Sequence, residues 1–116
     1  MTPHQIALDV LTTHGLTEAD AARALDEWEV VPYEQDGELA LVGLFKGTEF
    51  HCKALPNFDP KRREKIREAF APYIEREGYI TTRLEHGDTA NRRFNRLFGF
   101  EPTWSDERYT YFILKG

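Results

Sequence analysis

The chain has 116 residues, a length that fits one domain with a single core and is too short for two. Hydrophobic residues make up 41% of it and aromatic residues 13%, a composition typical of globular proteins that excludes a disordered chain. The net charge of -5 argues against general nucleic-acid binding.

The single cysteine and the hydropathy pattern also bear on the cellular compartment and on metal binding. Cys52 is the single cysteine, so no internal disulfide can form, and no metal-ligand spacing surrounds it. It is expected to be a buried thiol in a reducing compartment. The first residues have neither a basic start nor an apolar run of signal length, and no segment is apolar enough to span a membrane. We therefore expect a soluble, cytoplasmic protein without a metal.

The charges are unevenly distributed along the chain. Residues 1–45 carry nine acids and one base, whereas residues 46–100 carry twelve bases and eight acids. The bases gather in two clusters, one within residues 61–67 and one within residues 92–96. A locally basic centre in an acidic protein suits a small anionic ligand.

Two helices are expected first. The spacing of apolar residues predicts one over residues 5–13, ending at His14-Gly15. Thr17 is positioned to cap the second, with Asp20 as the acid of a capping box. The apolar face of the second helix is expected to consist of Ala21, Ala24, Leu25 and Trp28.

Three strands follow as an antiparallel meander. The residue pair Asp36-Gly37 is a strong signal for a hairpin turn. Pro32 places its strand at a sheet edge or at a bulge, because proline cannot donate to a neighbouring strand. The strands are expected over residues 29–35, 39–45 and 48–55.

The second half reads as helix, strand, helix, strand, strand. Gly78 and Gly99 mark the ends of the two helices, and Asp88 is a natural N-cap for the second. Pro72 either kinks the first helix or ends it near Ala71. The helix is expected over residues 60–77, and the strands over residues 79–86, 100–104 and 108–114. Leu97 is placed with Phe94 and Phe98 on the buried side of the last helix, and the expected core is Phe70, Ile74, Leu84, Phe94, Phe98, Phe100 and Phe112.

The run Leu97-Phe98-Gly99-Phe100 and the element order α-α-β-β-β-α-β-α-β-β resemble the GNAT superfamily of acyl-CoA N-acyltransferases. The resemblance covers essentially the whole chain, with the family's first strand missing or reduced to Met1-Thr2. It implies an α/β (α+β mixed) fold with a central mixed sheet. In that fold, residues 48–55 and 79–86 form a parallel strand pair that splays at its C-terminal ends, where acyl-CoA lies.

The resemblance also implies where the cofactor's pyrophosphate binds, at the N-terminus of the helix that joins the parallel strands. The family's loop there is rich in glycine, but residues 57–64 contain none. Lys61, Arg62 and Arg63 could replace backbone contacts with side-chain charge. The alternative is that these residues form a solvated helix face with ion pairs.

The last helix departs from the family as well. Counting back from Gly99, the family's frequent asparagine falls on Asp88, and its frequent tyrosine, which often protonates the leaving thiolate, falls on Asn95. Asp88 has a sufficient role as a helix cap. Asn91 and Asn95 are expected to contact the cofactor.

Two histidines are candidates for catalysis. The resemblance places His51 on the strand that borders the acyl group and His86 at the end of the neighbouring parallel strand. A neutral imidazole there could accept a proton from an amine. The alternative is that His51 is a structural sheet residue and His86 a turn residue.

Two functions remain open at this stage. One is transfer of an acetyl or acyl group from acetyl-CoA to a primary amine. The other is a catalytically inactive virion, assembly or interaction protein that contacts other phage or host proteins, because small chains of this kind without the glycines resemble proteins of tailed bacteriophages. Aromatic residues crowd the final strands, which favours a homo-oligomer. They are Trp104, Tyr109, Tyr111 and Phe112.

Overall fold

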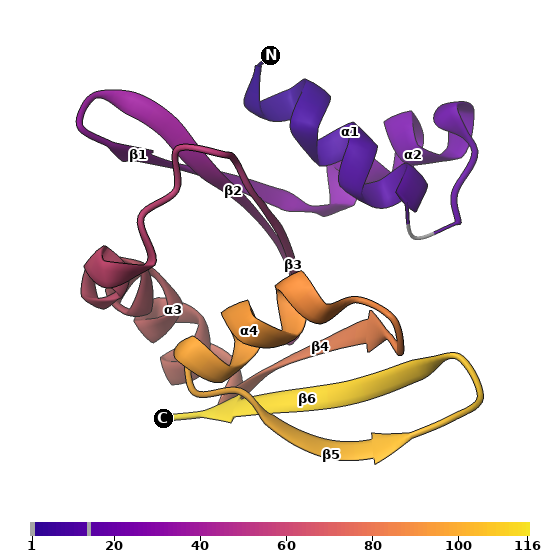
Figure 1. Ribbon diagram of the computed structural model, residues 1–116. Helices are drawn as coiled ribbons and strands as arrows, with labels where there is room; N and C mark the ends of the chain where they lie inside the picture. Colours follow the sequence, from indigo (N-terminus) through magenta and orange to yellow (C-terminus); the bar gives the residue numbers. More distant parts are fainter. Residues whose placement is uncertain (1, 14) are drawn as a thin grey trace. The chain divides into compact units, whose positions relative to one another are not determined.

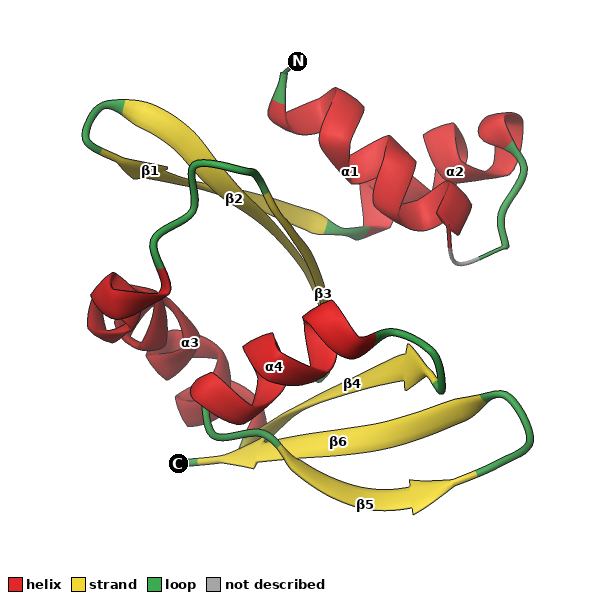
Figure 2. Ribbon diagram, viewed as in Figure 1, coloured by secondary structure: helices red, strands yellow, loops and turns green. Residues whose placement is uncertain are grey.

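The computed structural model describes residues 2–13 and 15–116, with all their side chains except that of Arg63 (Figures 1 and 2). The helices are α1 (Pro3–Thr13), α2 (Glu18–Ala24), α3 (Arg63–Glu77) and α4 (Thr89–Leu97), with the 3-10 turns η1 (Leu25–Glu27) and η2 (Pro60–Arg62). The strands are β1 (Glu29–Gln35), β2 (Glu38–Lys46), β3 (Glu49–Ala54), β4 (Tyr79–Glu85), β5 (Glu101–Ser105) and β6 (Tyr109–Lys115).

The expected element order and mixed α/β class are confirmed. Hydrogen bonds join the strands in the order β1-β2-β3-β4-β6-β5. The chain forms two compact units, which are described separately below. The first consists of residues 1–46 and 50–59, and the second of residues 47–49 and 60–116.

The first unit opens with a capped helix. The Thr2 backbone N–H donates to Gln5 Oε1 at 2.8 Å, and the Gln5 N–H donates to Thr2 Oγ1 at 3.2 Å. This reciprocal pair is a capping box, and Pro3 suits the first helical position. Thr2 therefore caps α1 and is not part of a strand. Of the two alternatives for the family's first strand, the one that places a remnant of it at Met1-Thr2 is not supported. Met1 and the expected helix end at His14 lie outside the described residues.

The core of the first unit lies where α1 and α2 pack on one face of β2. Thr17 caps α2 as expected, because its side chain accepts from the Asp20 N–H at 3.1 Å. The expected apolar face is only partly buried at Ala24 and Trp28. For Trp28 the reason is that η1 changes the residue spacing after α2. The buried residues of this core are Ile6, Ala7, Val10, Leu11, Ala21, Leu25, Val42 and Leu44.

The β1–β2 hairpin follows its sequence signals. Asp36 and Gly37 both have positive φ, 55° and 79°, as a two-residue type I′ turn requires. β1 is an outer strand, and its register with β2 shifts between Tyr33 and Glu34. Pro32 therefore lies on an edge strand next to a bulge, as expected.

The core of the second unit is aromatic. Phe98 is 1% exposed and meets Phe70 edge to face, with ring centroids 6.2 Å apart. Phe70 also meets Phe100 at 5.9 Å. All the expected core residues are buried except Ile74, which is half-buried in the last turn of α3. Leu97 is 38% exposed, which corrects its expected burial. It lies about 60° around the helix axis from Phe94, on the side away from Asn95 and Phe98, and so at the margin of the buried side.

α3 is continuous through Pro72 and ends at Gly78, which has a left-handed backbone conformation. The break near Ala71 does not occur. Pro72 is exposed, so water can bind the carbonyl oxygen that it leaves unbonded. The α-helix starts at Arg63 rather than at Pro60, because residues 60–62 form a 3-10 turn.

β3 and β4 are parallel neighbours, as expected. Glu49 lies opposite Thr81, and the Thr81 N–H donates to the Thr48 carbonyl at 2.6 Å. These three residues all belong to the second unit. A parallel pair needs a long crossover connection, which α3 supplies. Cys52, farther along β3, is half-buried rather than fully buried.

Candidate functional site

The basic start of α3 is the first element of the candidate site. Lys61 and Arg62 are exposed, and Arg62 occupies the N-cap position without a side-chain capping bond. The N-terminus of a helix attracts anions through its backbone N–H groups and its dipole. The Arg63 side chain lies outside the described residues, although its backbone begins α3.

The loop that precedes this helix is fixed without glycine. Gln35 is buried at the end of β1, and its side-chain amide makes two bonds to the backbone of one loop residue. The Asp59 N–H donates to Gln35 Oε1 at 2.7 Å, and Gln35 Nε2 donates to the Asp59 carbonyl at 3.1 Å. In addition, Asn57 Nδ2 donates to the Leu39 carbonyl at 3.1 Å. Side-chain amides therefore hold the backbone of this loop.

His51 lies in the first unit. It is 5% exposed, and its ring centroid is 5.5 Å from that of Trp28. Phe50, the preceding residue, contacts Phe45 instead, with centroids 4.9 Å apart. Because successive side chains of a strand point to opposite faces, His51 and Phe50 lie on different faces of β3. The burial of His51 against Trp28 is consistent with the alternative that His51 is a structural residue of the sheet.

His86 lies in the second unit, in the turn after β4, and both of its ring nitrogens have partners. Nε2 lies 2.8 Å from the Asp106 carbonyl oxygen, and Nδ1 lies 3.3 Å from Thr110 Oγ1. A carbonyl oxygen only accepts, so the neutral ring carries its proton on Nε2. Nδ1 is then the basic nitrogen. Arg92 Nη2 donates to the same Thr110 hydroxyl at 3.2 Å.

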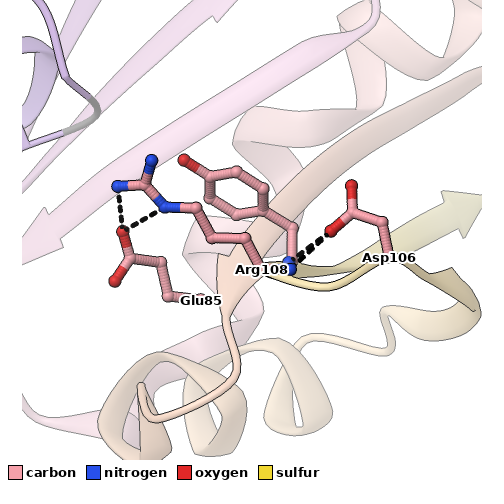
Figure 3. A network of polar contacts seen from close by, with 4 residues as sticks. Glu85, Asp106 and Arg108 are labelled. Carbon is pink, nitrogen blue, oxygen red and sulfur yellow. Dashed lines mark hydrogen bonds and ion pairs between the residues drawn. The ribbon is translucent and has the colours of Figure 1, made fainter.

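A polar network fixes the β5–β6 hairpin next to this histidine (Figure 3). The Asp106 carboxylate accepts from the N–H groups of Tyr109 and Arg108, at 2.6 and 2.9 Å. These two bonds, with a third from the Tyr111 hydroxyl, hold the pKa of Asp106 below its usual range. Arg108 also donates to Glu85 at 2.9 Å, and this bond raises the pKa of the guanidinium.

The depressed pKa of Asp106 predicts a loss of stability in acid. A carboxyl group with a lower pKa in the folded state stabilises the fold above its unfolded pKa, about 3.9 for aspartate. That contribution is lost as the pH falls through the folded-state pKa. The difference in unfolding free energy between wild type and Asp106→Ala should therefore shrink on acidification from pH 6 to pH 3, measured by urea denaturation. Replacing the neighbouring exposed acid, Glu107→Ala, is the control, and an unchanged Asp106→Ala difference would contradict the prediction.

The two asparagines of α4 have different environments. Asn91 Nδ2 donates to Asp88 Oδ2 at 2.8 Å, and the Asn91 N–H donates to Asp88 Oδ1 at 3.2 Å. Asp88 is thus the expected N-cap, and Asn91 belongs to the cap. Asn95 is 3% exposed, and its Nδ2 has no hydrogen-bond partner among the described residues. A buried amide donor without a partner costs free energy that a ligand can recover.

The second unit therefore contains most of the predicted site residues. The basic start of α3, His86 and the asparagines of α4 lie within it, and His51 lies in the first unit. Sequence reasoning missed Gln35, Thr110 and Asp106. Asp106 carried a signal, since an aspartate before a strand often accepts from backbone N–H groups two and three residues on.

Solved structures of acetyltransferases share this fold. Over 99% of this chain and 92% of the other, the structure is similar to the N-acetyltransferase PseH of Campylobacter jejuni in complex with acetyl coenzyme A, with 17% identity and a TM-score of 0.64. It is similar to a Bacillus subtilis acetyltransferase in complex with CoA over 94% and 90% of the two chains, with 12% identity and a TM-score of 0.61. A GNAT-family acetyltransferase of Listeria monocytogenes matches over 90% and 74%, with 12% identity and a TM-score of 0.59.

The chain therefore has the GNAT acetyltransferase fold. At these identities the likeness establishes the fold. No protein-family model matches the sequence, and no curated protein matches it. The phage origin suggested by the sequence receives no support from these comparisons. Within residues 2–13 and 15–116, no helix is long and apolar enough to cross a membrane, and no group of three or more His, Cys, Asp or Glu could hold a metal ion.

Proposed function

We propose that the protein is an N-acyltransferase that transfers an acetyl group from acetyl-CoA to a primary amine. The observation that carries this proposal is the buried Asn95 amide, whose Nδ2 lacks a partner within the described part of the chain. It lies on the last helix of a fold whose solved relatives include complexes with acetyl-CoA and CoA. The nitrogen is enclosed by the protein in this structure, so it can donate to an acceptor atom of a ligand only if α4 opens when the ligand binds.

The residues have separate roles in this proposal. Acetyl-CoA supplies the activated acyl group. Lys61, Arg62 and Arg63 bind its phosphates by charge, aided by the positive end of α3. Asn95 donates to an acceptor atom of the bound cofactor, and Asn91, through its bonds to the N-cap, holds the first turn of α4 next to the cofactor.

His86 is the proposed proton acceptor. It is exposed, so an amine can reach it from solution, and the Asp106 carbonyl fixes the proton on Nε2. In the resting state the Thr110 hydroxyl donates to Nδ1 at 3.3 Å. Once this hydroxyl rotates away, Nδ1 can take the proton that the amine loses on attack. His51 is the second candidate for this role.

Calorimetric titration with acetyl-CoA and with free CoA tests the proposal directly. Heat of binding at submillimolar ligand, followed by acetylation of an amine, is the expected result. No heat at millimolar ligand would overturn it.

A substitution at Asn95, whose amide nitrogen has no partner among the described residues, gives a sharper test. Asn95→Leu keeps the number and branching of the side-chain heavy atoms and removes a buried polar group, so the unfolding free energy should stay constant or rise. The affinity for acetyl-CoA should fall about tenfold, the value of one neutral hydrogen bond left unmade. Thermal unfolding and calorimetry measure the two quantities. Lower stability with unchanged affinity would show that the amide is structural.

The histidines are distinguished by kinetics. His86→Ala should lower kcat by about 10²–10⁴ and leave the affinity for acetyl-CoA unchanged, as expected when a proton acceptor is lost. His51→Ala should lower the melting temperature, because it leaves a cavity beside Trp28, and should reduce kcat less than His86→Ala does. The reverse order of kcat values would assign the proton transfer to His51.

A second candidate function is an interaction protein of the same fold that does not use CoA. The loop before α3 favours it, because Gln35 and Asn57 fix the backbone without the glycines of the family's phosphate loop. Its partners would be phage or host proteins or a second copy of the chain. The outer strands of the sheet are β1 and β5, and each contains a proline and a bulge. These features disfavour pairing of two copies of the chain through the edges of the sheet. Light scattering, which measures the mass of the particle in solution, tests whether a second copy of the chain binds.

A further inference from the structure

The sheet of the second unit has one covered and one open face. Thr110 and Phe112 of β6 are buried, and the Thr110 hydroxyl accepts from Arg92 of α4. Side chains alternate along a strand, so Tyr109 and Tyr111 lie on the opposite face. Trp104 of β5 is paired with Tyr111 and is 58% exposed. Trp104 is the most exposed of the large hydrophobic side chains in the described part of the chain.

Three residues on this face form an ordered group, called here the hairpin cluster: Trp104, Asp106 and Tyr111. The Trp104 and Tyr111 rings are stacked, with centroids 4.3 Å apart and an interplanar angle of 5°. The Tyr111 hydroxyl donates to Asp106 Oδ2 at 3.1 Å. The Asp106 carboxylate is ionised at neutral pH, as any aspartate of ordinary pKa is, and its hydrogen bonds lower the pKa further. A fixed negative charge therefore stands beside an aromatic stack.

Such a group is complementary to a cation. Aromatic faces attract ammonium and guanidinium groups, and a carboxylate nearby adds direct charge attraction. The same sheet face already shows this chemistry, because the guanidinium groups of Arg83 and Arg108 lie 4.6 and 5.2 Å from the Tyr109 ring centroid. Arg108 is also paired with Glu85. Among the described residues, no cation lies over the Trp104 ring.

We propose that the hairpin cluster binds the ammonium group of an aliphatic diamine or polyamine, the amine acceptor of the reaction. This inference rests on the proposed acyl transfer and names its substrate class. The cluster selects a protonated nitrogen, whereas acyl transfer needs a neutral one. A molecule with two amines satisfies both requirements, with one nitrogen at the cluster and the other near His86. Asp106 connects these two places at the end of the hairpin, because its carboxylate accepts from the Tyr111 hydroxyl and its carbonyl oxygen lies 2.8 Å from His86 Nε2. The molecule would therefore pass around the end of the sheet.

The chemistry of the transfer balances with this acceptor. The lone pair of the neutral amine forms a C–N bond to the acyl carbon, and the C–S bond breaks. The amine loses one proton to the histidine base, and the sulfur leaves with the electron pair of the C–S bond. The protonated histidine gives up that proton to the solvent, the sulfur takes one up, and CoA is released as the thiol. The second amine stays protonated throughout.

Binding can be measured without acetyl-CoA, so that it is independent of turnover. The chain has two tryptophans, and their indole N–H signals in ¹H–¹⁵N spectra report on Trp104 and, as an internal control, on the half-buried Trp28. Titration with spermidine should shift the Trp104 signal and leave that of Trp28 in place. n-Butylamine, with one amine, should bind the cluster with its ammonium but should be a poorer acyl acceptor, because its only nitrogen is held there protonated.

Two variants complete the experiment. Trp104→Leu keeps apolar area but removes the ring, and should weaken spermidine binding, measured calorimetrically, about two- to fivefold. Tyr79→Leu, an exposed aromatic on β4 paired with Lys115, is the matched control and should have no effect. In turnover assays, Trp104→Leu should raise KM for spermidine without changing KM for acetyl-CoA.

The outcomes are distinguishable. Equal spermidine affinities of wild type and Trp104→Leu, or a shift of Trp28 instead of Trp104, would overturn the inference. If the protein acetylated a lysine-containing peptide in preference to spermidine, the proposed class of amine acceptor would be wrong. Spermidine binding at Trp104 without any heat from acetyl-CoA would uphold the cation site and refute the acyl transfer.

Discussion

Reversing two charges at the start of α3, Arg62→Glu together with Arg63→Glu, is expected to remove acetyl-CoA binding while the protein stays folded. Each charge-assisted hydrogen bond to phosphate contributes about 1.5–3 kcal/mol, so losing two should weaken binding at least about 100-fold. The fold should tolerate the change, because acids suit the first turn of a helix. Calorimetry measures the affinity, and thermal unfolding measures the stability.

A matched control lies at the other end of the same helix. Arg76 lies about 20 Å along α3 from the helix start. Arg76→Glu is combined with Lys115→Glu on β6, so that the net charge changes by the same amount. This pair should leave the affinity within about twofold of wild type. The wild-type affinity should also fall with added salt, because the contacts depend on side-chain charge. Equal effects of the two reversals would mean that the phosphates bind elsewhere or that only overall charge matters.

The largest loss of stability is expected for Phe98→Ala. Phe98 is 1% exposed and contacts Phe70 and Phe94, with ring centroids 6.2 and 4.3 Å apart. Removing the ring leaves a cavity that the rigid surroundings fill only in part. The unfolding free energy should fall by about 3–5 kcal/mol. This corresponds to a decrease in melting temperature of roughly 10–25 °C for a domain of this size.

The adjacent residue supplies the control for this substitution. Leu97→Ala removes a side chain of the same helix that is 38% exposed, and should cost less than about 1 kcal/mol. Chemical denaturation of the three proteins gives the comparison. A melting temperature for Phe98→Ala close to that of Leu97→Ala would show that α4 does not pack through Phe98.

The secondary structure could be predicted largely from the sequence because its signals are local. Asp36-Gly37 gives the hairpin turn, Thr17 and Asp88 cap their helices, and Gly78 ends α3. In each case the residue satisfies backbone groups within four positions or adopts a conformation that other residues avoid. The parallel pairing of β3 with β4 also followed, since a strand, a helix and a strand in succession favour it.

Two expectations were less accurate, for different reasons. The capping box of Thr2 and Gln5 is a local signal that the sequence analysis did not use, and it excludes the alternative of a strand remnant at Thr2. Leu97 matched the apolar spacing of α4 but lies at the margin of its buried side. The exposure of Leu97 does not depend on residue type alone, because it is set by the groups that the rest of the fold brings near.

The candidate site divides in the same way. By itself the sequence determined that the start of α3 is basic. It also determined that one histidine lies in β3 and that another follows β4. Only the tertiary structure decided what surrounds them. It fixed the proton of His86 through the Asp106 carbonyl, and it buried Gln35 against the backbone of Asp59. It also left the Asn95 amide without a partner among the described residues. Hydrogen bonds between distant residues depend on distance and direction in space, which strand pairing and helix packing set and which spacing along the chain does not encode.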